Sequence, residues 1–210
     1  MNFAEIRREY EGTPLGPDSV HPDPVVQFRR WFDEALDAGI GQANAMALAT
    51  ASADGAPSAR MVLLKGFDEH GFVFFTNYGS RKGRELEENP RAELVFYWEE
   101  LHRQVRIYGQ VERVSALESE EYFQTRPYEA RVGAAVSRQS EELGSREELE
   151  AAIRDRRRKN PAGVERPPHW GGYRVRPVRL EFWQGRESRL HDRVEYCWEG
   201  CGWRIVRLFP

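Results

Sequence analysis

The chain has 210 residues, 40% of them hydrophobic, which suffices for one substantial core but not for two full domains. Its 31 basic and 34 acidic side chains leave a formal net charge of −3, which argues against a general nucleic-acid binder, because phosphate contacts need a positive surplus. The first residues lack a long apolar run, so we expect no secretory signal, no membrane span and a cytoplasmic location.

Cysteine and histidine usage gives no sign of a metal centre. Cys197 and Cys201 are too few for a disulfide framework or a complete structural zinc site. The five histidines show no metal-ligand spacing, so we predict no metal site and ordinary reduced thiols. The strongest basic run, residues 154–159, ends a predicted helix that Ser145 and Glu148 open as a capping box. A solvated helix end explains this run better than a nucleic-acid patch.

The first predicted element is a helix that follows a polar arm. Asp23 and Pro24 are suited to the N-cap and the first helical position, and Gly39 to the end. Apolar residues follow at helical spacing between them: Val25, Phe28, Phe32 and Leu36. We therefore predict a mobile arm or lid over residues 1–22, outside the core, and a single domain over residues 23–210.

The rest of the chain predicts a mainly β protein with peripheral helices, of the α+β class. Short strand-like runs separated by turn signals cover residues 45–51, 58–66, 72–76, 91–99, 102–114, 173–184, 190–198 and 203–208. Helical patterns cover residues 80–88, 116–135 and 146–159. Short connections favour antiparallel pairing, so we expect a closed or nearly closed barrel decorated by helices.

The helix predicted after Ser80 has its charges in an unfavourable order. Cations occupy its first turn and carboxylates lie toward its end: Arg81, Lys82 and Arg84, then Glu85, Glu87 and Glu88. This order opposes the helix dipole, at a cost of roughly 0.3 to 1 kcal/mol per charge. A phosphate bound at the N-terminus would reverse that cost. The alternative is a tolerated pattern of surface charge.

A second anion site is indicated near the C-terminus, in Phe182-Trp183-Gln184-Gly185 and Arg189-Leu190-His191-Asp192-Arg193. On a strand, Arg189, His191 and Arg193 would project from one face and repel one another unless an anion lay among them. The alternative is a solvated barrel exterior with scattered charges.

These segments resemble the pyridoxine/pyridoxamine 5'-phosphate oxidase family, whose members are FMN enzymes of the split-barrel class. Further motifs agree with that family in the same order along the chain: Arg7-Arg8-Glu9-Tyr10, Arg60-Met61-Val62-Leu63-Leu64-Lys65, Phe75-Thr76-Asn77, Ser80-Arg81-Lys82, Arg103-Gln104-Val105, Tyr122-Phe123 with Arg126-Pro127, and Ser137-Arg138-Gln139-Ser140. The resemblance implies an antiparallel, Greek-key split barrel that forms a homodimer with FMN at the subunit interface.

The resemblance also implies the residues that contact each ligand. Residues matching FMN-contact positions are Arg60, Met61, Val62, Leu63, Leu64, Lys65, Phe75, Thr76, Arg81, Lys82, Gln104, Gln139, Ser140, Trp183 and Arg193. Those matching substrate positions are Arg7, Arg8, Glu9, Tyr10, Lys65, Tyr122, Arg126, Arg189, Leu190 and His191. Arg189 and His191 would position the reacting end of the substrate, and His191 is suited by its pKa to proton transfer.

Two features complicate this assignment. Arg60 and Lys65 would lie roughly 17 Å apart on opposite faces of a regular strand, so a bend, a bulge or a second subunit must bring both to one flavin. The chain also has Ala130 where the family usually offers the substrate phosphate a serine, and Ala135 where it has a tryptophan. One lost hydroxyl contact costs about 1 kcal/mol.

The implied activity is FMN-dependent oxidation of pyridoxine 5'-phosphate or pyridoxamine 5'-phosphate to pyridoxal 5'-phosphate, with O2 reduced to H2O2. Two alternatives stay open. One is a related split-barrel flavin oxidase acting on another ring compound, such as a phenazine precursor. The other is a non-catalytic module that binds flavin or pyridoxal phosphate.

Overall fold

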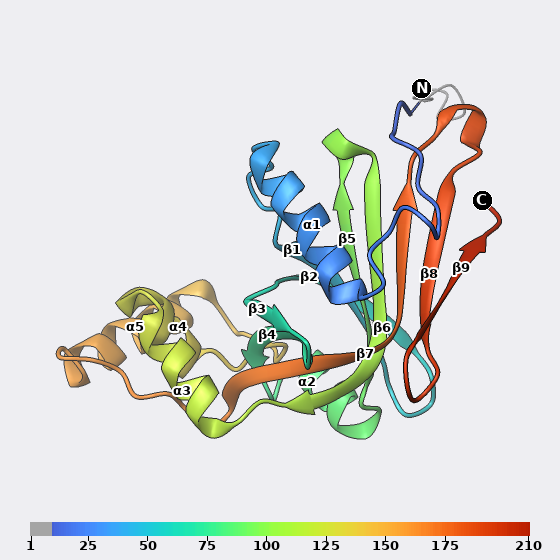
Figure 1. The fold of residues 1–210 in the computed structure, drawn as a ribbon. Helices are drawn as coiled ribbons and strands as arrows, with labels where there is room; N and C mark the ends of the chain where they lie inside the picture. The colour runs from blue at the N-terminus through green and yellow to red at the C-terminus, as the bar shows by residue number, and fades with distance from the viewer. Residues whose placement is uncertain (1–9) are drawn as a thin grey trace, which may run out of the picture.

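The computed structural model describes residues 10–210 (Figure 1). The helices are α1 Pro24–Asp37, α2 Arg81–Glu88, α3 Ala116–Thr125, α4 Tyr128–Val136 and α5 Arg146–Lys159. The strands are β1 Ala45–Ala51, β2 Pro57–Leu63, β3 Gly66–Asp68, β4 Gly71–Asn77, β5 Arg91–Trp98, β6 Arg103–Arg113, β7 Trp170–Gln184, β8 Asp192–Trp198 and β9 Trp203–Leu208. Short 3₁₀ helices cover Glu99–Leu101 and Glu187–Arg189.

Within the described residues, all strands join one antiparallel sheet that curls into a half-barrel. Its main order is β2-β1-β5-β6-β7-β4-β3, and β8 pairs with β7 and β9. The chain links the two ends of this order at Leu64 and Lys65, where the Lys65 N–H donates to the Val73 carbonyl oxygen at 2.8 Å. The curl therefore brings edge strand β2 near β4, and this junction forms part of the site described below.

Strand β7 is long and serves two parts of the sheet (Figure 1). Its first half pairs with β4, and its second half pairs with β8. A β-bulge interrupts its pairing with β6 between Tyr108 and Gly109. A Cβ at Gly109 would lie 2.1 Å from the Arg176 carbonyl oxygen, so only glycine permits this close approach.

The core is aromatic, and helix α1 supplies its centre. Phe28 is fully buried and makes edge contacts with Phe67 and Phe72, with ring centroids 4.9 Å apart in both pairs. The Asp23 side chain accepts from Val25 N–H and so caps α1, as predicted. The prediction that residues 1–22 lie outside the core is wrong for its later part. Leu15 and Val20 are buried in the same cluster, because their apolar side chains remain in contact with the sheet despite a Pro- and Gly-rich backbone.

The prediction of a single helix over residues 116–135 is wrong, because the structure has two helices there, α3 and α4. Pro127 follows α3, and Arg126 has extended backbone angles, as steric contact with a following proline favours. Tyr122 therefore lies on α3, whereas Arg126 lies just beyond its end. Ser145 caps α5, and four basic residues occupy the last turn of that helix, as predicted. Helices α3, α4 and α5 gather at one end of the molecule (Figure 1).

Candidate functional site

A cavity of about 1130 Å³ lies between β2, β4, α2 and the group formed by α3, α4 and α5. It brings together most of the predicted ligand-binding residues: Arg60, Met61, Val62, Leu63, Lys65, Phe75, Thr76, Arg81, Lys82, Tyr122, Arg126, Gln139 and Ser140. Leu64 does not line this cavity; it is buried in the hydrophobic core. Its side chain therefore anchors the end of β2 in the core.

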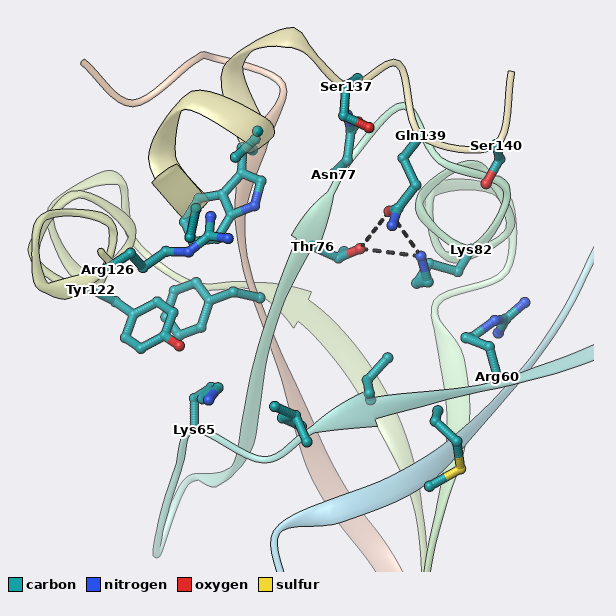
Figure 2. A pocket seen from close by; sticks show the side chains of 18 of the residues that line it. Arg60, Lys65, Thr76, Asn77, Lys82, Tyr122, Arg126, Ser137, Gln139 and Ser140 are labelled. Atoms are coloured by element: carbon teal, nitrogen blue, oxygen red, sulfur yellow. Dashed lines mark hydrogen bonds between the residues drawn. The ribbon is translucent and has the colours of Figure 1, made fainter. Parts of the chain in front are cut away.

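A regular strand would hold Arg60 and Lys65 far apart on opposite faces. The chain avoids this separation because β2 ends before Lys65. The strand stops at Leu63, Leu64 turns into the core, and Lys65 bonds to β4. Both cations then border the same cavity, Arg60 at one end and Lys65 at the other (Figure 2). A bend at the strand end, rather than a bulge inside the strand, produces this arrangement.

Lys82 occupies one end of the cavity and is only 6% exposed. Its Nζ donates to Thr76 Oγ1 at 3.2 Å and Gln139 Oε1 at 3.1 Å (Figure 2). It also donates to Ser80 Oγ at 3.3 Å. Burial, followed by the nearby charge of Arg60, lowers the pKa of Lys82 to about 8, against a smaller opposing effect of Glu85. Among the described residues, no carboxylate lies within salt-bridge distance of Lys82. A buried cation with neutral partners favours an anionic ligand.

Glu85 was placed near the helix end by the sequence, but its side chain returns to this same end of the cavity. It accepts from Thr50 Oγ1 at 2.5 Å, Ser58 Oγ at 2.6 Å, Arg60 Nη2 at 3.3 Å and Arg81 Nε at 2.9 Å. The i,i+4 spacing from Arg81 was the signal that could have identified it. Glu85 therefore partly offsets the unfavourable charge order of α2.

Arg126 lies at the end of the cavity opposite Lys82 (Figure 2). Its guanidinium lies 4.6 Å from the centroid of the Trp170 ring, and its Nη1 atom is buried without a hydrogen-bond partner among the described residues. Burial lowers the pKa of Arg126, although Tyr122 opposes this effect. Phe75 stacks on Tyr122, with ring centroids 4.0 Å apart. This end can hold an anionic group beside an aromatic ring.

The loop after α4 closes the cavity between these two ends. Asn77 Nδ2 donates to the Ser137 carbonyl oxygen at 3.0 Å, and Thr76 Oγ1 donates to Gln139 Oε1 at 3.2 Å. Ser140 has a positive φ of 74°, a conformation rarely adopted by residues other than glycine. Asn77 was not among the predicted ligand residues, and its role is to fix this loop.

Among the described residues, a second group of predicted ligand-binding residues does not border the cavity. Gln104, Trp183 and Arg193 are direct partners across β6, β7 and β8, so their side chains share one face of the sheet. Arg193 is bound to Glu181, with Nε 2.8 Å from Oε1 and Nη2 3.0 Å from Oε2. The hydrogen bond to Glu181 raises the pKa of Arg193 despite burial.

His191 belongs to this second group. Its ring centroid lies 4.7 Å from that of Trp183 and 5.6 Å from that of Tyr10. Its Nδ1 accepts from the Arg186 N–H at 3.1 Å, which leaves the proton of the neutral imidazole on Nε2. Burial and then the charge of Arg189 lower the pKa of His191. This environment favours a neutral ring that donates a hydrogen bond from Nε2.

The predicted strand starting at residue 190 is wrong in its first two residues, because β8 begins at Asp192. Arg189 ends a 3₁₀ turn with a φ of 60°, and Leu190 is exposed. Arg189, His191 and Arg193 therefore do not form a regular period-two row, because the turn changes the direction of the chain. The predicted residues Arg7, Arg8 and Glu9 lie outside the described residues.

Two family models match most of the chain. Residues 32–160 match the model described as pyridoxamine 5'-phosphate oxidase, and residues 170–210 match the pyridoxine 5'-phosphate oxidase C-terminal dimerisation region. This chain belongs to the pyridoxine/pyridoxamine 5'-phosphate oxidase family. Accordingly, it is an oxidoreductase.

Relatives of that name cover the full chain. One from Rubrobacter xylanophilus is 60% identical over 210 residues, covering 100% of this chain and 97% of its own. Another from Bordetella pertussis is 54% identical over 211 residues, covering 100% of both chains. The solved structure of PhzG from Burkholderia lata, in complex with tetrahydrophenazine-1-carboxylic acid, has a TM-score of 0.90 and 34% identity, covering 95% of this chain and 99% of PhzG.

A pyridoxamine 5'-phosphate oxidase-related, FMN-binding protein from Nostoc punctiforme shares the fold, with a TM-score of 0.71 at 20% identity over 91% of this chain and 99% of its own. The predicted split-barrel fold is thereby confirmed. Within residues 10–210, no helix is long and apolar enough to cross a membrane. The same residues contain no group of three or more His, Cys, Asp or Glu side chains placed to hold a metal ion.

Proposed function

We propose that this protein binds FMN and oxidises pyridoxine 5'-phosphate or pyridoxamine 5'-phosphate to pyridoxal 5'-phosphate, with O2 as the electron acceptor and H2O2 as the second product. The observation that carries the proposal is one large cavity with a separate cationic group at each end. Arg60 and Lys82 lie at one end and Arg126 near the other. Arg81 joins the first end, because it shares Glu85 with Arg60. Two cationic ends suit two phosphate-bearing molecules held together, a cofactor and its substrate.

The residues fit FMN in their chemistry. The N-terminus of α2, capped by Ser80, and the cations beside it are suited to a phosphate dianion. Thr76 and Gln139 offer polar groups next to Lys82. When bound, FMN supplies the capacity to accept a hydride from the substrate and to pass electrons to O2. The protein's contribution is to bind, orient and exclude water.

At the other end, the unpartnered Arg126 Nη1 supports a phosphate clamp for the substrate. Lys65 Nζ lies 5.9 Å from the Tyr122 ring centroid, so Lys65 and Tyr122 border the same space. Binding energy from the phosphate, which is remote from the reacting carbon, would hold that carbon in place. We assign Arg126, Tyr122 and Lys65 to substrate binding on this basis.

We further propose that the protein is a homodimer and that the second group of residues completes the cavity of the partner subunit. Gln104, Trp183 and Arg193 share a sheet face, and none of them borders the cavity of its own chain. Met61 and Leu63, which border the cavity, are 65% and 39% exposed, an apolar surface of the kind that a partner covers. The match of residues 170–210 to a dimerisation region supports the same arrangement.

In this arrangement, Arg189 and His191 reach the reacting end of the substrate from the partner subunit. The neutral His191 ring would donate from Nε2, because Nδ1 is occupied by the Arg186 N–H. The structure of His191 therefore favours hydrogen-bond donation and positioning over proton removal. Tyr10, whose ring packs against His191, would contact the substrate at the same site.

The visible spectrum of the FMN-loaded protein tests this function. Pyridoxine 5'-phosphate added without oxygen should bleach the flavin band, and air should restore it with pyridoxal 5'-phosphate formed. A flavin band whose absorbance is unchanged by either B6 phosphate would contradict the proposal. A protein that binds the ligands but never bleaches would instead be a non-catalytic flavin or pyridoxal-phosphate binding module.

A second candidate is oxidation of another ring compound. The cavity wall near Arg126 is formed by small or apolar residues: Ala130, Gly133, Ala134, Leu149 and Ile153. Such a wall leaves room for an apolar ring, and PhzG, of similar structure, was solved with tetrahydrophenazine-1-carboxylic acid. Anaerobic bleaching by that compound, and not by the B6 phosphates, would favour the second candidate.

A further inference from the structure

Glu85 is a buried carboxylate that contacts Arg60 and Arg81 at the cationic end of the cavity without lining the cavity itself. It is 5% exposed and receives four hydrogen bonds, two from hydroxyls and two from guanidiniums. Burial alone would raise the pKa of Glu85, but bonds from Ser58, Thr50 and Arg81, with the charge of Arg60, lower that pKa to about 2. The carboxylate therefore stays ionised at any pH at which the protein works.

The two guanidiniums depend on Glu85 to different degrees. Arg60 also donates to the Leu48 carbonyl oxygen at 3.1 Å, Thr50 Oγ1 at 2.6 Å and Ser58 Oγ at 2.5 Å. The Arg81 side chain is 62% exposed, and its Nε donates to Glu85 Oε1 at 2.9 Å. An arginine has five N–H donors in a fixed plane. Anchoring Arg81 through Nε orients the other four without using them.

The charges of this group also match a phosphate monoester. Arg60, Arg81 and Lys82 together carry three positive charges when protonated, and Glu85 carries one negative charge. The difference is two, close to the charge of −1.5 to −2 of a phosphate monoester at neutral pH. Without Glu85, three cations would crowd together in the ligand-free protein, and Arg81 would lose its anchor.

We propose that Glu85 is a positioning residue that fixes Arg60 and Arg81 in the geometry required by the phosphate of FMN. This inference rests on the proposed function. Glu85 repels a phosphate directly, so its contribution to binding must come from orienting the guanidiniums and from separating their charges. If removal of Glu85 weakens FMN binding, orientation of the guanidiniums dominates. If removal strengthens FMN binding, repulsion of the phosphate dominates.

The test compares FMN with riboflavin, which has the same ring system but no phosphate. Dissociation constants are measured by flavin fluorescence on ligand-free protein for wild type, Glu85→Ala, Glu85→Gln and Glu87→Ala. Glu85→Ala should weaken FMN about tenfold and leave riboflavin unchanged. Glu85→Gln keeps an oxygen acceptor for Arg81 and should recover part of the loss. Glu87→Ala removes the same charge from an exposed carboxylate paired with Arg113 and should change neither constant.

An unchanged ratio of the two constants in Glu85→Ala, or tighter FMN binding, would overturn the inference while leaving the proposed function intact. If Glu85→Ala does not fold, Glu85→Gln decides, because it must still lower the preference for FMN. A wild-type protein with no preference for FMN over riboflavin would overturn both the inference and the proposed phosphate end of the cavity.

Discussion

The two groups of predicted ligand-binding residues differ in how they are built. The cavity group comprises the predicted residues that line the cavity, together with Glu85. It is held within one chain, where Lys82 and Glu85 each make several hydrogen bonds. The second group, around Trp183 and His191, lies on a sheet face and a turn, and Ser188 and Arg189 both have positive φ. The first group resembles a preformed binding site, whereas the second presents a sheet face and a turn that we propose a partner subunit meets. This contrast motivates the proposal that each active site draws on two subunits.

The largest expected effect separates chemistry from cofactor binding. His191→Ala should slow reduction of the flavin by substrate about a hundredfold, because the ring that would orient the reacting end is lost, while FMN stays bound to the cavity group. Stopped-flow absorbance without oxygen measures this step. His70→Ala, at an exposed turn position, serves as the control and should match wild type. Unchanged reduction in His191→Ala would remove His191 from the site.

Glu85 in the cavity group should make the stability of the protein depend on pH in the acid range. The pKa of Glu85 in the folded protein, about 2, lies below its ordinary value of 4.5. A depressed carboxylate pKa stabilises the protein above the unfolded pKa, and this stabilisation is lost as pH falls toward the folded pKa. Between pH 6 and pH 3, wild type should therefore lose about 2 kcal/mol more unfolding free energy than Glu85→Gln. Urea unfolding at both pH values measures the difference, and parallel losses would contradict it.

A β-bulge interrupts the pairing of β6 with β7 between the cavity group and the second group. We expect that Gly109, on β6 at this bulge, tolerates no side chain. Gly109→Ala places a Cβ 2.1 Å from the Arg176 carbonyl oxygen, so it should destabilise the protein by about 2 kcal/mol. Gly66→Ala is the matched control, because a Cβ there meets nothing within 4 Å. Thermal unfolding compares the two variants. Equal melting temperatures would show that the close approach at the bulge is not required.

The smallest expected effect concerns the charge of Lys82. Its lowered pKa of about 8 means that FMN affinity should fall as pH rises above about 8, because the protonated lysine favours the phosphate. Lys82→Met should bind FMN about tenfold more weakly at pH 7 and should lose this dependence on pH. Fluorescence titrations from pH 6.5 to pH 9.5 test both statements. A wild-type affinity that is constant over this range would contradict them.

Much of the fold followed from local patterns. Asp23, Ser80 and Ser145 cap helices as their residue types predict, and β1 has its predicted bounds. The break before α4 and the turn before β8 were missed, although Pro127 was a visible signal for the first. The sequence predicted Lys82 as an anion ligand, but not Glu85 beside it, because a side chain that folds back across a helix turn depends on tertiary contacts. The separation of Trp183 and His191 from the cavity depends on long-range sheet pairing, which no local motif specifies.

Subunit complementation tests the central claim most directly. Arg126→Ala impairs the cavity group, and His191→Ala impairs the second group. If each active site combines the two groups from different subunits, a mixed dimer contains one intact site and one doubly impaired site. Equal amounts of the two variants, exchanged at random, should then recover about a quarter of the wild-type rate. No recovery, despite dimers shown to have exchanged, would contradict a site shared between subunits.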